Sequence, residues 1–259
     1  MAIDPGFLVL CVAGALAYVV RGITGGASAI VFNALFGLAL AFHLTGSLTL
    51  LDGLAWVALG DLVTGFVLLV VIRREIRMEP FLRRFLIASV PVSAATTFLL
   101  PRIDLGLLTI GLGLTLAGAG SYLLLRREIG TWDEATLLRR AGPWGVAAGA
   151  LGGLFGMAGP VSMIYLAHAG GSPTRYRARI TTLSVFWSTT RVTALAAAGL
   201  LSVGQVVQFG LTVPAILAGL GLGYLIHPHV GPRPFRAGLG LVVSVAGILL
   251  VIRTLGAGG

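Results

Sequence analysis

The segment 21-RGITGGASAIVFN-33 places an arginine and three glycines between two long apolar runs of a 259-residue chain. The segment 152-GGLFGMAGPVSMI-164 repeats this arrangement, with glycines and a proline between two further apolar runs. Glycine permits positive φ and close approach of the backbone, and proline suits the first position of a helix. Each segment is therefore predicted to contain a turn after which a new helix begins.

The composition indicates a membrane protein. The chain is 57% hydrophobic and only 10% charged, and apolar runs long enough to cross a bilayer recur along it. All 18 basic residues are arginines, most of them in short loops, so the net charge of +9 indicates membrane topology rather than nucleic-acid binding. The single cysteine, Cys11, excludes an intramolecular disulfide and a cysteine-rich metal site. We predict an all-α polytopic membrane protein, and we expect no metal or other cofactor.

The distribution of arginine predicts the orientation of the chain. Fourteen of the 18 arginines lie in four connections, which are residues 73–84, 126–140, 175–179 and 227–236. The connections predicted at the other side hold one arginine between them. Because positively charged loops stay in the cytoplasm, the first four connections should be cytoplasmic and both termini should lie outside.

The apolar segments divide into two halves of opposite orientation. Repeat 1 (1–126) contains a glycine-broken hairpin and three helices, repeat 2 (143–259) contains the same elements, and 127–142 is a cytoplasmic linker. The predicted hairpins are 5–42 and 143–170, and the predicted transmembrane helices are 45–72, 83–100, 104–125, 180–200, 205–226 and 237–252. Segments 143–157 and 160–170 are too short to cross separately, which predicts a re-entrant hairpin. Inverted-topology repeats with interrupted helices are typical of secondary transporters; accidental periodicity of an apolar chain is the alternative.

The two predicted turns favour an anion-binding site. A helix that begins inside the protein directs free N–H groups and a positive dipole end at its surroundings, and two such ends could converge from opposite faces. The alternative is that the glycines only permit close helix packing. The predicted substrate-binding residues are Arg21, Gly22, Thr24, Gly25, Gly26, Ser28, Asn33, Gly156, Met157, Ala158, Gly159 and Arg191.

Two arginines lie outside the loops in positions that suggest function. Arg191 is near the centre of segment 180–200, where an unpaired charge costs at least about 2.5–3.5 kcal/mol. The nearby Ser188, Thr189, Thr190 and Thr193 suggest a polar lining. Arg21 is either the floor of the first turn or an ordinary charge at the cytoplasmic edge of the membrane.

Acidic residues and a histidine supply candidates for coupling. Asp52 and Asp61 are nine residues apart, about 900° of helix rotation, so they face opposite sides. Asp61 is predicted near the depth of Arg191. Asp61 and Arg191 are therefore expected to form a structural ion pair. In the alternative, functional interpretation, Asp61 or Asp52 takes up a proton or competes for Arg191 as the substrate leaves. His168, like Asn33, is a candidate for hydrogen bonding in the limb that follows a turn.

The motif GITGG after an apolar helix, echoed by 149-GALGGLFGMAGP-160, resembles the glycine-rich motif that recurs in both halves of the sulfite exporter TauE/SafE family. The resemblance implies a small prokaryotic inner-membrane permease that moves sulfite, sulfonates or related sulfur-containing anions. The sequence departs from the family pattern at four positions, because Thr24 and Ala158 replace a central glycine, Asn33 stands where proline is common, and Arg21 precedes the motif.

The expected function is secondary transport of a small sulfur-containing anion by alternating access. The proton is the candidate coupling ion. The predicted partners are that anion and the lipid bilayer. An anion channel that uses the same arginine-lined path is the alternative. An enzyme is not expected, because the chain has no HExxH pair, no GxSxG-type serine turn and no cysteine nucleophile.

Overall fold

The computed structural model describes residues 5–125, 130–226 and 232–257, so the predicted linker 127–142 lies partly outside the described residues. The described residues form helices and no strands, and each predicted apolar segment coincides with one helix. In chain order the helices are α1 (Pro5–Thr24), α2 (Ser28–Ala41), α3 (Leu50–Val71), α4 (Pro80–Leu99), α5 (Leu105–Leu125), α6 (Glu134–Phe155), α7 (Gly159–His168), α8 (Pro173–Ala197), α9 (Val203–Ile226) and α10 (Pro232–Ala257). Short 3₁₀ turns, η1 (Arg73–Glu75) and η2 (Leu100–Arg102), follow α3 and α4.

Six of the described helices are long and apolar enough to cross a membrane. They are α1, α3, α4 with η2, α5, α9 and the Gly238–Gly256 part of α10. By contrast, α2 has 14 residues and α7 has 10. At 1.5 Å per residue these two helices cover about 21 and 15 Å, less than the roughly 30 Å of a hydrocarbon core. The chain is therefore a multi-pass membrane protein that also contains two short helices.

Helix α6 is longer than the predicted segment 143–157, so the prediction that this segment is short is wrong. The helix begins at Glu134 and has 22 residues. Leu137 is buried in its first turns, and its carbonyl accepts a hydrogen bond of 2.8 Å from the hydroxyl of Tyr165. Charged residues on the exposed side of these turns interrupt the apolar pattern. The apolar run read from the sequence therefore begins about two and a half turns too late.

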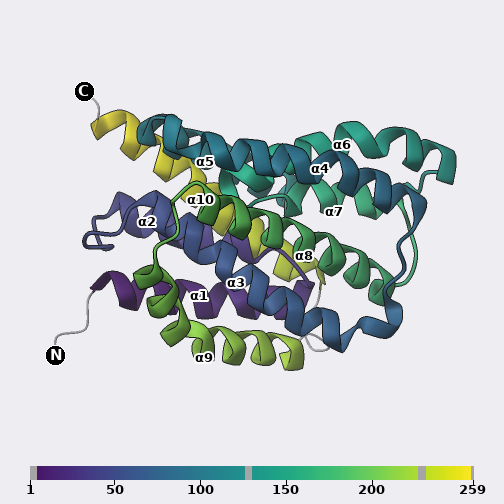
Figure 1. Cartoon of the computed structure of the whole chain (residues 1–259), viewed down its shortest axis with the longest axis horizontal. Coiled ribbons are helices and arrows are strands. Elements are labelled where there is room, and N and C mark those ends of the chain that lie inside the picture. Colours follow the sequence, from purple (N-terminus) through teal and green to yellow (C-terminus); the bar gives the residue numbers. More distant parts are fainter. Residues whose placement is uncertain (1–4, 126–129, 227–231, 258–259) are drawn as a thin grey trace.

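The two short helices point to opposite ends of the bundle (Figure 1). Phe42, directly after α2, lies beneath Arg253 near the end of α10, with 4.7 Å between the guanidinium carbon and the ring centroid. At the other end, the carbonyl of Gly170, just after α7, accepts a hydrogen bond of 2.6 Å from Arg179. Arg179 also forms an ion pair of 2.6 Å with Glu79, which precedes α4. Helix α1 begins at the same end of the molecule at which α10 finishes (Figure 1).

The helices pack as pairs that cross between the predicted halves. The most extensive contacts are α1 with α9, α4 with α6, α3 with α8, and α5 with α10. One hydrophobic core is built mainly from α1, α2, α3, α5, α9 and α10, and a second from α4, α6, α7 and α8. In the predicted repeats, α1 to α5 correspond in order to α6 to α10. Exchanging the two halves therefore turns the α1–α9 contact into the α6–α4 contact, and it turns α3–α8 and α5–α10 into themselves. The predicted inverted repeats would give this pattern for these four pairs, and the repeats themselves remain a prediction.

Glycines set the close contact between α6 and α4. A methyl group placed on Gly145, Gly149 or Gly153 would overlap backbone atoms of Phe85, Ser89 or Ser93. Small residues at such spacing allow two helix backbones to approach in membranes. The pair therefore depends on the absence of side chains on one face of α6.

We expect Gly149→Val to lower the thermal unfolding midpoint of the purified protein. Its side chain would displace the Ser89 backbone, and overpacking of this kind costs about 1–3 kcal/mol. The matched control is Gly221→Val in α9, because a Cβ at Gly221 meets nothing within 4 Å. Equal midpoints for the two variants would contradict the glycine-dependent packing.

Candidate functional site

In each turn a glycine in the left-handed conformation closes the preceding helix. Gly25 and Gly156 have φ values of 79° and 70°, in the left-handed region that favours glycine. Their N–H groups donate to the carbonyls of Arg21 and Gly152, at 2.7 and 2.9 Å. Because the same interval separates both pairs of residues, each turn closes one helix in the same way before a short helix begins.

The helices after the turns begin with N–H groups that have no helical partner among the residues that the structure describes. Val31 N–H donates to Ala27 O at 3.3 Å in α2, and Ser162 N–H donates to Ala158 O at 3.1 Å in α7. A helix start leaves the backbone N–H groups of its first residues, here those just before Val31 and Ser162, without a helical partner. Ala27 itself has a φ of 66°, which for alanine costs about 1–2 kcal/mol. Strain at a helix start of this kind is common at functional sites.

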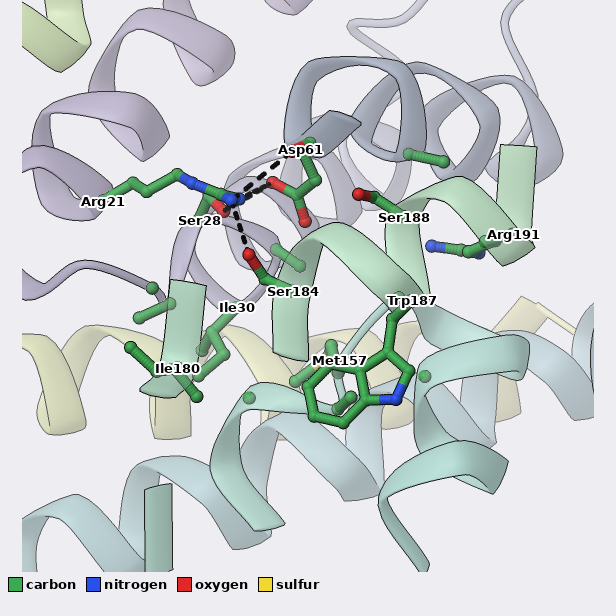
Figure 2. A pocket seen from close by; sticks show the side chains of 18 residues that line it. Arg21, Ser28, Ile30, Asp61, Met157, Ile180, Ser184, Trp187, Ser188 and Arg191 are labelled. Atoms are coloured by element: carbon green, nitrogen blue, oxygen red, sulfur yellow. Dashed lines mark hydrogen bonds and ion pairs between the residues drawn. The ribbon is translucent and has the colours of Figure 1, made fainter. Parts of the chain in front are cut away.

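Both turns line one pocket with a cavity volume of about 50 Å³. Residues 26–30 border it from the first turn and residues 156–159 from the second, and residues of α1, α3, α6 and α8 complete the wall. The wall combines the apolar side chains of Ile30, Ile180 and Trp187 with charged and hydroxyl groups (Figure 2). The predicted convergence of the two turns on one place is therefore observed.

Arg191 projects from α8 into this pocket (Figure 2). Its side chain is 3% exposed, and its Nε and Nη2 atoms are buried without a hydrogen-bond partner among the described residues. A methyl group on Gly156 would overlap the guanidinium, so the arginine lies directly against the second turn. A buried cation with unused donors is costly, which makes Arg191 the strongest candidate among the described residues for contact with an anion.

Arg21 forms the ion pair of the pocket. Its Nη1 lies 2.6 Å from Oδ1 of Asp61, and it also donates to the hydroxyl groups of Ser28 at 3.0 Å and Ser184 at 2.9 Å. Arg21 is 1% exposed, so it is a buried pocket residue rather than an edge charge. The predicted Asp61–Arg191 ion pair is wrong, because the last turn of α1 brings Arg21 against the face of α3 that carries Asp61.

Four of the predicted binding residues support the turns from outside the pocket. The hydroxyl of Thr24 donates to Val20 O at 2.8 Å and accepts from Gly26 N–H at 3.2 Å. Asn33 donates from Nδ2 to Phe155 O at 2.7 Å and so ties α2 to the end of α6. The remaining two are Gly22, which packs against the backbone of α9, and Gly25, which packs against Arg177.

Asp52 and His168 lie away from the pocket. Asp52 caps α3 through the N–H and hydroxyl of Thr49, at 2.8 and 2.7 Å, and accepts from Gln205 at 2.6 Å. His168 stacks on Trp132 with 3.7 Å between ring centroids, and its Nδ1 lies 2.7 Å from Gly130 O. Both residues therefore have partners at the ends of helices and do not line the pocket.

Sequence reasoning missed Ser184 and Trp187. Ser184, Ser188 and Arg191 recur at intervals of four and three residues on α8, so helical spacing counted back from Arg191 would have found Ser184. Thr189, Thr190 and Thr193 do not line the pocket. The described residues contain no group of three or more His, Cys, Asp or Glu that could hold a metal ion.

A multi-pass helical bundle with a buried cationic pocket at the start of two interrupted helices is typical of membrane transport proteins. The model of the sulfite exporter TauE/SafE family matches residues 10–250, and the chain belongs to this family. No curated protein and no solved structure matches the chain. The family resemblance predicted from the glycine motifs is thus confirmed, and it identifies a transporter family whose named substrate is sulfite.

Proposed function

We propose that the protein is a secondary transporter that binds a small sulfur oxyanion, such as sulfite, in the pocket between the two turns. The observation that carries this proposal is Arg191, whose guanidinium is buried, has unused donors and lies against the second turn. The free N–H groups at the starts of α2 and α7 supply further donors, and their dipoles favour negative charge. Gly26, Ser28, Met157, Ala158 and Gly159 complete the proposed site.

The size of the cavity favours a compact anion. A cavity of about 50 Å³ compares with the 10–15 Å³ that one water molecule requires, so it accommodates only a few heavy atoms. Sulfite is a compact oxyanion, whereas an organosulfonate also brings a carbon chain. Of the two substrate classes expected from the sequence, the inorganic oxyanion is therefore the better fit.

The proposed transport cycle is alternating access between two inverted repeats, 1–126 and 143–259. The opposite directions of α2 and α7 and the contact pattern of the helix pairs support this arrangement. The proposed location is the cytoplasmic membrane of a prokaryote, with the arginine-rich connections inside and both termini outside. In this cycle the pocket opens to one side of the membrane at a time.

Uptake of radiolabelled sulfite into proteoliposomes tests the proposal. We expect saturable uptake, and transient accumulation of label when the vesicles are preloaded with unlabelled sulfite, because a carrier exchanges substrate across the membrane. Linear flux without this counterflow would instead identify a channel. Flux no greater than that of protein-free vesicles would rule out sulfite transport.

A further inference from the structure

Within the described part of the chain, only one oxygen of the Asp61 carboxylate accepts hydrogen bonds. Oδ1 accepts hydrogen bonds from Arg21 at 2.6 Å, from Ser28 at 2.6 Å and from the hydroxyl of Tyr18 at 3.1 Å. Oδ2 accepts none from the described residues. Figure 2 shows this second oxygen turned away from Arg21 and towards the interior of the pocket, which Asp61 lines. A negatively charged oxygen therefore faces the space proposed for an anion.

The groups around Asp61 define the charge of the pocket. The described charged and titratable groups that face it are Tyr18 and Arg21 from α1 and Arg191 from α8, while α2 presents only the hydroxyl of Ser28. Two arginines and one ionised carboxylate give a formal charge of plus one. Protonation of Asp61 raises this charge to plus two, which matches a divalent oxyanion.

A divalent anion beside Arg191 also changes which form of the Asp61 carboxyl group, ionised or neutral, is the more stable. Like charges repel strongly where protein excludes water, so a bound anion favours the neutral carboxylic acid. Protonated at Oδ2, Asp61 becomes a donor that can bind the anion directly instead of repelling it. Ionisable residues inside membrane proteins commonly serve such proton steps.

We propose that Asp61 binds one proton together with each divalent oxyanion, so that the proton is the coupling ion of this transporter. The inference rests on the proposed function, because it requires an anion in the pocket. The proton adds to Oδ2, the hydrogen bonds of Oδ1 remain, and no other bond forms or breaks. By thermodynamic linkage, the anion tightens proton binding by the same factor by which the proton tightens anion binding.

The test is proton uptake by the purified protein when sulfite binds. Sulfite is added to detergent-solubilised protein in weak buffer with a pH indicator, at a pH where free sulfite is the dianion. Thermal stabilisation reports binding in the same samples. We expect wild-type protein to take up about one proton for each sulfite bound at saturation.

Two variants assign the proton to Asp61. Asp61→Asn mimics the neutral acid, so it should bind sulfite without taking up a proton. Asp61→Ser replaces it if the asparagine variant does not fold. The matched control is Asp52→Asn, because Asp52 lies at the exposed start of α3 outside the pocket and should leave proton uptake unchanged.

The outcomes separate this inference from the proposed function. Sulfite binding to wild-type protein without proton uptake overturns the inference and leaves the function standing. Undiminished uptake in the Asp61→Asn protein also overturns it, since the proton would then reside elsewhere, for example on sulfite. A folded asparagine variant that binds no sulfite overturns it too. If wild-type protein neither binds nor transports sulfite, the proposed function itself fails.

Discussion

Arg191→Gln is expected to lower the rate of sulfite uptake into proteoliposomes by about a hundredfold or more. Hydrogen bonds to a charged partner contribute roughly 1.5–3 kcal/mol each, and the two buried donors Nε and Nη2 would supply two of them. Each 1.4 kcal/mol corresponds to a factor of about ten, so losing both exceeds a hundredfold. Glutamine keeps a hydrogen-bonding side chain but removes the charge that attracts the anion.

The stability of the same variant separates a binding role from a structural one. In the absence of anion, Arg191 is a buried charge whose Nε and Nη2 have no hydrogen-bond partner in the described part of the chain. Its removal should therefore leave the thermal midpoint unchanged or raise it. A structural arginine would show the reverse, a lower midpoint. Arg253→Gln is the matched control, because Arg253 is exposed near the end of α10 and contacts the ring of Phe42. If the Arg191 and Arg253 variants transported sulfite equally well, Arg191 would have no part in binding.

The helices and the two turns could be predicted from the sequence because their causes are local. An apolar run of about 20 residues forms a helix in a membrane wherever its neighbours lie. Gly25 and Gly156 mark the turns because the left-handed conformation that closes each helix strongly favours glycine. Arg191 could be recognised for a similar reason, since a charge at the centre of an apolar segment is costly by itself.

The pairing of charged side chains could not be predicted in the same way. The similar predicted depth of Asp61 and Arg191 in the membrane suggested that they form an ion pair. Whether two side chains pair also depends on how each helix is rotated about its axis. That rotation is set by close contacts such as the hydrogen bond of Tyr18 to Asp61, which joins residues far apart in the chain. The contact between Asn33 and Phe155 is of the same kind, because it joins α2 to the end of α6, which only the complete fold brings together.

Gly156→Ala is expected to reduce sulfite uptake by about tenfold or more and also to destabilise the protein. The φ of 70° at this position costs an alanine about 1–2 kcal/mol. The added methyl group would overlap the guanidinium of Arg191, so the arginine must move away from the second turn. A displacement of about 1 Å in a binding group is enough to cost a large part of its activity.

Gly199→Ala isolates the effect of this contact from the backbone strain. Gly199 has a φ of 71°, close to that of Gly156, but a Cβ there meets nothing within 4 Å and the residue lies outside the pocket. Both alanine variants should therefore lose similar stability from strain, while only Gly156→Ala should lose transport. Parallel thermal unfolding and uptake measurements make the comparison. Equal loss of transport in the two would mean that strain, rather than contact with Arg191, governs activity, and the second turn would then have no direct role in positioning the arginine.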